Sequence, residues 1–82
     1  MTRDRDRVAL TFGDSVRSRR EALELSQLEV AGRVGVDRAH LSQIEKGRHC
    51  PGLDLALALC RVVGIDDLQA ACGELVDGVA GW

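Results

Sequence analysis

The chain has 82 residues, of which 45% are hydrophobic and 2% aromatic, and its formal net charge is −2. This length suits one small domain, and we expect neither a separate ligand-sensing domain nor a small-molecule effector. There is no apolar run long enough to span a bilayer, no signal-peptide pattern, and no metal-ligand spacing among the three cysteines. We therefore expect a cytoplasmic protein with reduced thiols and with no cofactor, metal or membrane partner.

Positive charge is concentrated in the first part of the chain. Residues 1–50 carry ten Lys and Arg against eight Asp and Glu, whereas residues 51–82 carry one Arg against five acidic residues. An acidic C-terminal part does not exclude a nucleic-acid partner, because surface charges are screened beyond about 10 Å at 0.1 M salt.

The N-terminal segment is predicted to be a flexible arm followed by a helix. Met1 to Arg7 carry alternating Arg and Asp and no apolar anchor, so a flexible arm is expected over residues 1–8. Their arginines could contact phosphate or a minor groove, and a solvated terminus is the alternative. The first helix is expected to begin near residue 9 or 11 and to end at Leu23, with Phe12, Val16 and Leu23 on its buried side.

Two short helices joined by a tight turn are predicted next. Ser26 and Glu29 have the spacing of a capping box at the start of the first of these helices. Gly35 can adopt the left-handed conformation that ends it. Asp37 can then cap the second helix.

The second of these helices has two unlike faces. Leu41 and Ile44 form an apolar face, and the opposite face carries Arg38, Ala39, Ser42, Gln43 and Lys46. Arginine can bond bidentately to guanine and glutamine to adenine, while a small residue permits close approach. The outer face therefore suits the major groove of DNA. The main base contacts are expected to be Arg38 and Gln43, and the secondary ones Ala39, His40 and Ser42.

The run from Leu25 to Gly47 resembles the helix-turn-helix of the phage repressor and Cro family, often called the XRE family. The matching pattern is L-S-Q-x-x-(apolar)-A-x-x-(apolar)-G-V-x-x-x-x-L-S-x-I-E-x-G. With Pro51 and the apolar run after it, the resemblance covers roughly residues 12 to 68. It implies an all-α, lambda repressor-like domain whose second helix enters the major groove. Glu24 and Leu28 depart from the family, which often has glycine and a polar residue at these positions.

The resemblance also implies roles for single residues. Arg20 is expected to pair with Glu45 and to tie the first helix to the recognition helix; a free surface arginine is the alternative. Gln27 is expected to touch a phosphate and to brace the recognition helix, although it could simply be solvated. The full set of expected phosphate contacts is Ser26, Gln27, Lys46 and Arg48, and the loop with Lys46 and Arg48 could instead be merely charged and solvated.

Two more helices are predicted after Pro51. The first, from about residue 53 or 54 to 63, is apolar nearly all round and so is expected to be covered on more than one side. The second begins at Asp66 or Asp67, which completes a compact five-helix bundle over residues 9–79 with a tail at 80–82. A second copy of the chain is expected to cover these helices, and a monomer in which they cover one another is the alternative. The predicted dimer interface is Leu55, Leu59, Val62, Leu68, Cys72, Leu75 and Val76.

These features predict a homodimeric, sequence-specific regulator of transcription that binds double-stranded DNA at a roughly palindromic operator. The sequence contains no catalytic constellation, so an enzyme is not expected. The stretch D-R-A-H-L-S-Q-I-E and the chain length most resemble a restriction–modification controller protein. The alternatives are a phage Cro-like switch, an autoregulating antitoxin and a protein-binding adaptor with the same fold. RNA polymerase or a toxin could be a further partner.

Overall fold

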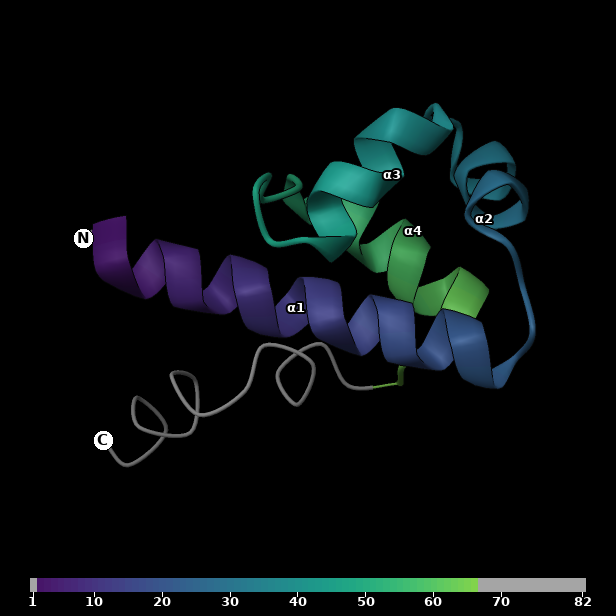
Figure 1. Ribbon diagram of the computed structural model, residues 1–82, viewed down its shortest axis with the longest axis horizontal. Coiled ribbons are helices and arrows are strands. Elements are labelled where there is room, and N and C mark those ends of the chain that lie inside the picture. The colour runs from purple at the N-terminus through teal and green to yellow at the C-terminus, as the bar shows by residue number, and fades with distance from the viewer. Residues whose placement is uncertain (1, 67–82) are drawn as a thin grey trace.

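A computed structural model describes residues 2–66 of the protein, with side chains placed from residue 6 onward. This part of the chain forms four α-helices: Thr2–Ala22 (α1), Gln27–Val34 (α2), Arg38–Glu45 (α3) and Leu53–Val63 (α4). In Figure 1, α1 runs along one side of the domain, α3 lies on the other, and α4 lies between them. The all-α helix-turn-helix architecture is confirmed over residues 2–66. The predicted fifth helix, the tail at 80–82 and the proposed interface residues Leu68, Cys72, Leu75 and Val76 lie outside the described residues.

The first helix is longer than the sequence predicted. α1 begins at Thr2, so the segment expected to be a flexible arm is helical from residue 2 onward. The segment has no glycine or proline before Gly13, and once a helix has nucleated, each added residue contributes a hydrogen bond at small entropic cost. The absence of an apolar anchor was therefore a poor guide to where the helix begins. None of the helices in the described part is long and apolar enough to cross a bilayer.

Each helix contributes its apolar face to one core. The residues that share this cluster are Phe12, Val16, Val30, Ala31, Leu41, Ile44, Ala56, Leu59, Cys60 and Val63. Leu59 was predicted to face a second copy of the chain, and this is corrected because the side chain is completely buried within the protomer. It belongs to the stripe of α4 that repeats every three to four residues and packs against α1 and α2. Leu55 and Val62 are partly buried against the same cluster, whereas Leu23, expected to be buried, is exposed.

Two close approaches hold α1 against the recognition helix. A Cβ atom on Gly13 would collide with the carbonyl oxygen of Ile44, so the α1 backbone lies directly against the end of α3. Gly47 has φ +75°, and a Cβ there would stand 2.8 Å from Cα of Leu10. Only residues without a side chain allow α1 and the end of α3 to come this close.

The chain enters and leaves α2 through two left-handed residues. Glu24 has φ 58° before α2 and Gly35 has φ 83° after it. A left-handed conformation costs a residue with a Cβ about 1–2 kcal/mol and costs glycine almost nothing. Glu24 therefore makes the turn at a position where the resembled family often has glycine, at the cost of backbone strain.

The predicted helix caps are confirmed. Ser26 Oγ accepts from the backbone N–H of Glu29 at 3.0 Å, and Glu29 Oε1 accepts from the N–H of Ser26 at 2.9 Å. These bonds from Ser26 hold the pKa of Glu29 below its usual value of 4.5. Asp37 Oδ1 accepts from the N–H of His40 at 2.8 Å and so caps α3. Local capping therefore sets the boundaries of both short helices.

Candidate nucleic-acid interface

The outer face of α3 is open to solvent. Leu41 and Ile44 are fully buried beneath it, while Arg38, Ala39 and Gln43 are exposed and Ser42 is half-buried. The buried leucine and isoleucine hold the helix on the core, so the exposed side chains project from a fixed support. Four of the five residues predicted to reach base edges therefore lie on the outer face of one short helix.

His40, the fifth predicted base contact, is placed differently. Its ring lies edge-on to His49 of the loop after α3, with ring centroids 4.7 Å apart. Its Nε2 atom is buried and has no hydrogen-bond partner among the described residues. The His40 side chain thus packs toward the loop and is not grouped with Arg38 and Gln43.

An ion pair joins α1 to the end of α3. Arg20 Nε donates to Glu45 Oε2 at 2.8 Å, and Arg20 NH2 donates to Glu45 Oε1 at 3.0 Å. The Arg20 side chain is 12% exposed and the Glu45 side chain is 2% exposed. The hydrogen bond to Glu45 raises the pKa of Arg20 above its usual value. Arg20 NH1 also donates to the backbone carbonyl of Leu25 at 2.9 Å. This bond holds the segment between α1 and α2 against α1. The structure thus contains the Arg20–Glu45 pair that the resemblance implied.

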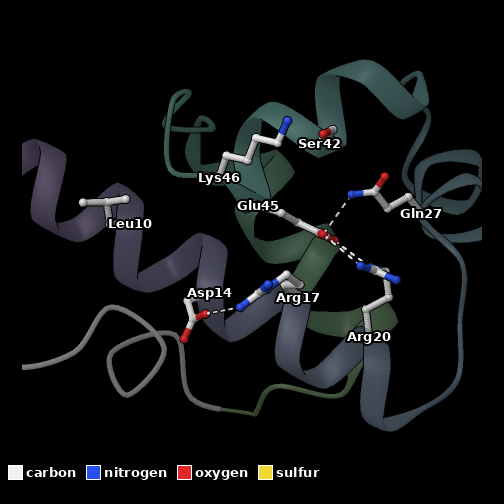
Figure 2. A pocket seen from close by; sticks show the side chains of 8 residues that line it. All are labelled: Leu10, Asp14, Arg17, Arg20, Gln27, Ser42, Glu45 and Lys46. Atoms are coloured by element: carbon white, nitrogen blue, oxygen red, sulfur yellow. Dashed lines mark hydrogen bonds and ion pairs between the residues drawn. The ribbon is translucent and has the colours of Figure 1, made fainter.

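Gln27 connects this buried pair to the exposed face. Its Nε2 donates to Glu45 Oε1 at 3.0 Å, and its Oε1 accepts from Arg38 NH1 at 3.4 Å. The contact to Glu45 appears in Figure 2, where Gln27 reaches from α2 toward the carboxylate. Gln27 is therefore not simply solvated: it bridges the structural carboxylate and the arginine expected to read a base.

The remaining residues predicted to contact phosphate surround this network. Ser26 is exposed at the start of α2, where free backbone N–H groups favour an anion. Lys46 and Arg48 are exposed after α3. Together with Gln27 they place hydrogen-bond donors at both ends of the exposed α3 surface.

A hollow of about 300 Å³ lies beside this surface, between α1 and α3. Its lining residues are Leu10, Asp14, Arg17, Arg20, Gln27, Ser42, Glu45 and Lys46. Figure 2 shows Arg17 and Arg20 on the α1 side, with Arg17 directed along α1 toward Asp14; Ser42 and Lys46 lie on the other side, and Glu45 lies between. The sequence reasoning did not assign Asp14 or Arg17 to the site. The available signal was that Arg17 and Arg20 are three residues apart and so share one face of α1.

The described side chains include no group of three or more His, Cys, Asp or Glu that could hold a metal ion. Cys50 is an exposed free thiol and Cys60 is buried in the core. The arginine, lysine, glutamine and serine side chains at this surface supply hydrogen bonds and positive charge.

Sequence comparison finds relatives of this chain. An uncharacterized HTH-type transcriptional regulator of Methanothermobacter thermautotrophicus is 41% identical over 54 residues, which are 66% of this chain and 78% of the relative. The uncharacterized HTH-type transcriptional regulator y4dL of Sinorhizobium fredii is 37% identical over 55 residues, and the match spans 28% of its length.

The fold also matches a solved structure. The crystal structure of the clp gene regulator ClgR from Corynebacterium glutamicum aligns with a TM-score of 0.75 at 22% identity, over 90% of this chain and 81% of that one. At this identity the match shows a shared fold. Residues 11–71 match the helix-turn-helix domain family, which is most of the chain. This chain therefore belongs to the helix-turn-helix family of DNA-binding transcriptional regulators.

Proposed function

We propose that the protein regulates transcription as a homodimer that binds a roughly palindromic operator through α3. The observation that carries this proposal is the outer face of α3, held by Leu41 and Ile44 beneath and by the Arg20–Glu45 pair at its end. A recognition helix must present its side chains in a fixed register, because each base edge offers a specific pattern of donors and acceptors. The outer face of α3 meets that requirement, because both the apolar core and the Arg20–Glu45 pair hold the helix in place.

Base readout is assigned to Arg38 and Gln43, with Ala39 and Ser42 secondary. Both main residues are exposed and can form the bidentate contacts that distinguish guanine and adenine. Phosphate contacts are assigned to Ser26, Gln27, Lys46 and Arg48, which flank that face. His40 is left out of this set because its ring packs against His49.

The homodimer is proposed from the apolar surface of α4. Leu53 and Leu57 are exposed on a helix whose other face is in the core, and Leu55 and Val62 are only partly covered. Pairing of two copies through this helix would bury these side chains and place two recognition helices on successive major grooves. Such an arrangement requires half-sites about 34 Å, or one turn of DNA, apart.

Within this class we propose a restriction–modification controller protein, on the basis of the D-R-A-H-L-S-Q-I-E stretch. An antitoxin or an adaptor is the second candidate, and the exposed Leu28, 68% accessible at the start of α2, favours it. An exposed leucine beside the DNA-facing helices could contact a protein partner such as a toxin or RNA polymerase.

Selection of duplexes from a random DNA pool tests the proposal. We expect enrichment of a two-fold symmetric site with half-site centres about 10 base pairs apart, bound by two copies of the chain. The mass of the complex, measured by sedimentation, checks the stoichiometry. No binding to any duplex at low salt would exclude DNA as the partner and would favour the adaptor.

A further inference from the structure

The hollow between α1 and α3 contains donors that the helix-turn-helix itself does not supply. Four of its lining residues, Leu10, Asp14, Arg17 and Arg20, come from α1, outside the recognition unit, and the donors among them are the two arginines. Arg17 places a positive charge on the α1 side of the hollow, opposite Lys46 (Figure 2).

Only some of the polar groups around the hollow are already committed. The Arg20 guanidinium is engaged by both oxygens of Glu45 and by the carbonyl of Leu25. Gln27 is engaged by Glu45 and Arg38. By contrast, no hydrogen bond or ion pair involves the Lys46 ammonium or the Ser42 hydroxyl within the described part of the chain. The Lys46 ammonium and the Ser42 hydroxyl can therefore bind a ligand without losing an existing hydrogen bond or ion pair.

The contact that holds Arg17 is easily exchanged. Arg17 NH2 lies 3.0 Å from Asp14 Oδ1, and the two side chains are 52% and 67% exposed. An ion pair this exposed adds little to stability, because solvent screens it and ordering two long side chains opposes it. The guanidinium can therefore turn to a different anion at low cost.

The charges around the hollow favour an anion. Glu45 is neutralised by Arg20 and Asp14 by Arg17, so the charge of Lys46 is left over. A phosphodiester in the hollow would meet the Lys46 ammonium, and the Ser42 hydroxyl, assigned above as a secondary base contact, would then bond the phosphate instead. The phosphodiester could also receive two parallel N–H bonds from an arginine, the geometry that guanidinium offers to phosphate.

The position of the hollow points to DNA as the source of that phosphate. Gln27 lines the hollow and also bonds Arg38, and Ser42 lines it directly before Gln43 on α3. A phosphate held here would belong to the strand that borders the groove occupied by α3. We propose that the hollow seats one DNA backbone phosphate, and that Arg17 exchanges Asp14 for it and so extends the DNA contact to α1. This proposal rests on the DNA-binding function proposed above.

Salt-dependent binding of the full chain to a selected duplex and to a random duplex tests this assignment. Removing one cation that neutralises a phosphate should reduce the slope of log K against log salt by about 0.9 per protomer. We expect Arg17→Ala to do this and to weaken binding about tenfold on both duplexes equally, because a phosphate carries no base identity. Arg61→Ala is the matched control, since Arg61 is an exposed arginine of α4 that does not line the hollow. We expect it to leave the slope almost unchanged.

Asp14→Asn separates a phosphate contact from a general loss of charge. It removes the carboxylate that competes for Arg17, so affinity for both duplexes should rise or stay equal. Thermal unfolding of each variant should match the parent, because the exposed pair contributes little to stability. Equal slopes for Arg17→Ala and Arg61→Ala, with binding intact, would overturn the role of Arg17 and leave the proposed function standing. Absence of salt-dependent binding in the parent would overturn both.

The NMR signal of the Arg17 Nε–H group distinguishes DNA from free phosphate. We expect the selected duplex to shift this signal at stoichiometric concentration, and inorganic phosphate at constant ionic strength to compete with the duplex only weakly. A signal shifted by inorganic phosphate and unchanged by the duplex would make the hollow a free-anion site and would refute the proposal.

Discussion

The recognition helix is held by two contacts of opposite character. Its underside, Leu41 and Ile44, is buried in a purely apolar cluster with residues such as Leu59 of α4. Its C-terminal end is held by a buried carboxylate, Glu45, that bonds Arg20 of α1 and Gln27 of α2. Apolar packing is non-directional and roughly proportional to buried area, whereas the polar contact requires particular distances and angles.

This difference suggests a division of roles between the two contacts. A buried ion pair gains little net stability over well-packed apolar residues, yet it is costly to break on one side only. The apolar contact therefore accounts for most of the stability, and the polar contact sets the rotation of α3 relative to α1 and α2. The predictions that follow separate these two roles.

Removing the carboxylate should have the largest effect on stability. Glu45→Ala removes the carboxylate that accepts two hydrogen bonds from the part-buried Arg20 guanidinium, which keeps only the Leu25 carbonyl and the exposed Glu21 at 4.0 Å. We expect a loss of about 3–5 kcal/mol in the free energy of unfolding. Urea denaturation measures this loss. Replacing both residues, with Arg20→Met and Glu45→Leu, should recover most of the stability while DNA binding stays impaired. Recovery of binding together with stability would contradict an orienting role for the pair.

Truncation on the apolar side should also destabilise the fold, without altering the orientation of α3. Leu59→Ala removes a completely buried side chain, and we expect it to cost about 2–5 kcal/mol through reduced burial and a cavity. At a temperature where the variant is folded, its affinity for the selected duplex should equal that of the parent. Leu23→Ala, at an exposed leucine directly after α1, is the stability control.

Arg38 should affect binding and leave the fold unchanged. Arg38→Ala removes an exposed side chain that donates to Gln27 at 3.4 Å, so the free energy of unfolding should change little. On the selected duplex we expect a loss of about 1–3 kcal/mol and relaxed preference at one base position, measured by competition among single-base variants. An equal loss on random DNA would place Arg38 on a phosphate and not on a base.

The smallest expected effect is at the turn before α2, which belongs to neither contact. Glu24→Gly relieves the strain of φ 58°, about 1–2 kcal/mol, but increases the entropy of the unfolded chain by about 0.5–1 kcal/mol. We therefore expect the free energy of unfolding to rise by a net amount between zero and about 1.5 kcal/mol, measured by thermal unfolding, with DNA binding unchanged. The reverse kind of change, Gly35→Ala at φ 83°, should destabilise the protein.

Features encoded by neighbouring residues were predictable from the sequence. The capping box of Ser26 and Glu29, the left-handed Gly35 and the cap at Asp37 all depend on residues within one turn, and all are confirmed. The Arg20–Glu45 pair links residues 25 positions apart and was expected only because the motif resembles a known family.

Features that depend on how helices pack were missed. Leu59 was assigned outward because α4 is apolar on nearly all sides, and periodicity alone does not say which side meets the core. The approach of Gly13 to Ile44 and the hollow beside Arg17 depend on the crossing of α1 over α3, which no local pattern specifies. Low hydrophobicity predicts a flexible arm at residues 1–8, yet α1 begins at Thr2, because propagation of an existing helix needs no apolar anchor.

The contact at Gly13 limits how this protein can be engineered. Replacing glycine by alanine inside a helix usually raises stability, since alanine has the highest intrinsic helix propensity. Here the added methyl group would push the Ile44 carbonyl aside and shift the whole reading surface. Mutant libraries aimed at a more heat-resistant variant should therefore keep residue 13 constant and diversify the solvent-facing positions of α1 on either side of it.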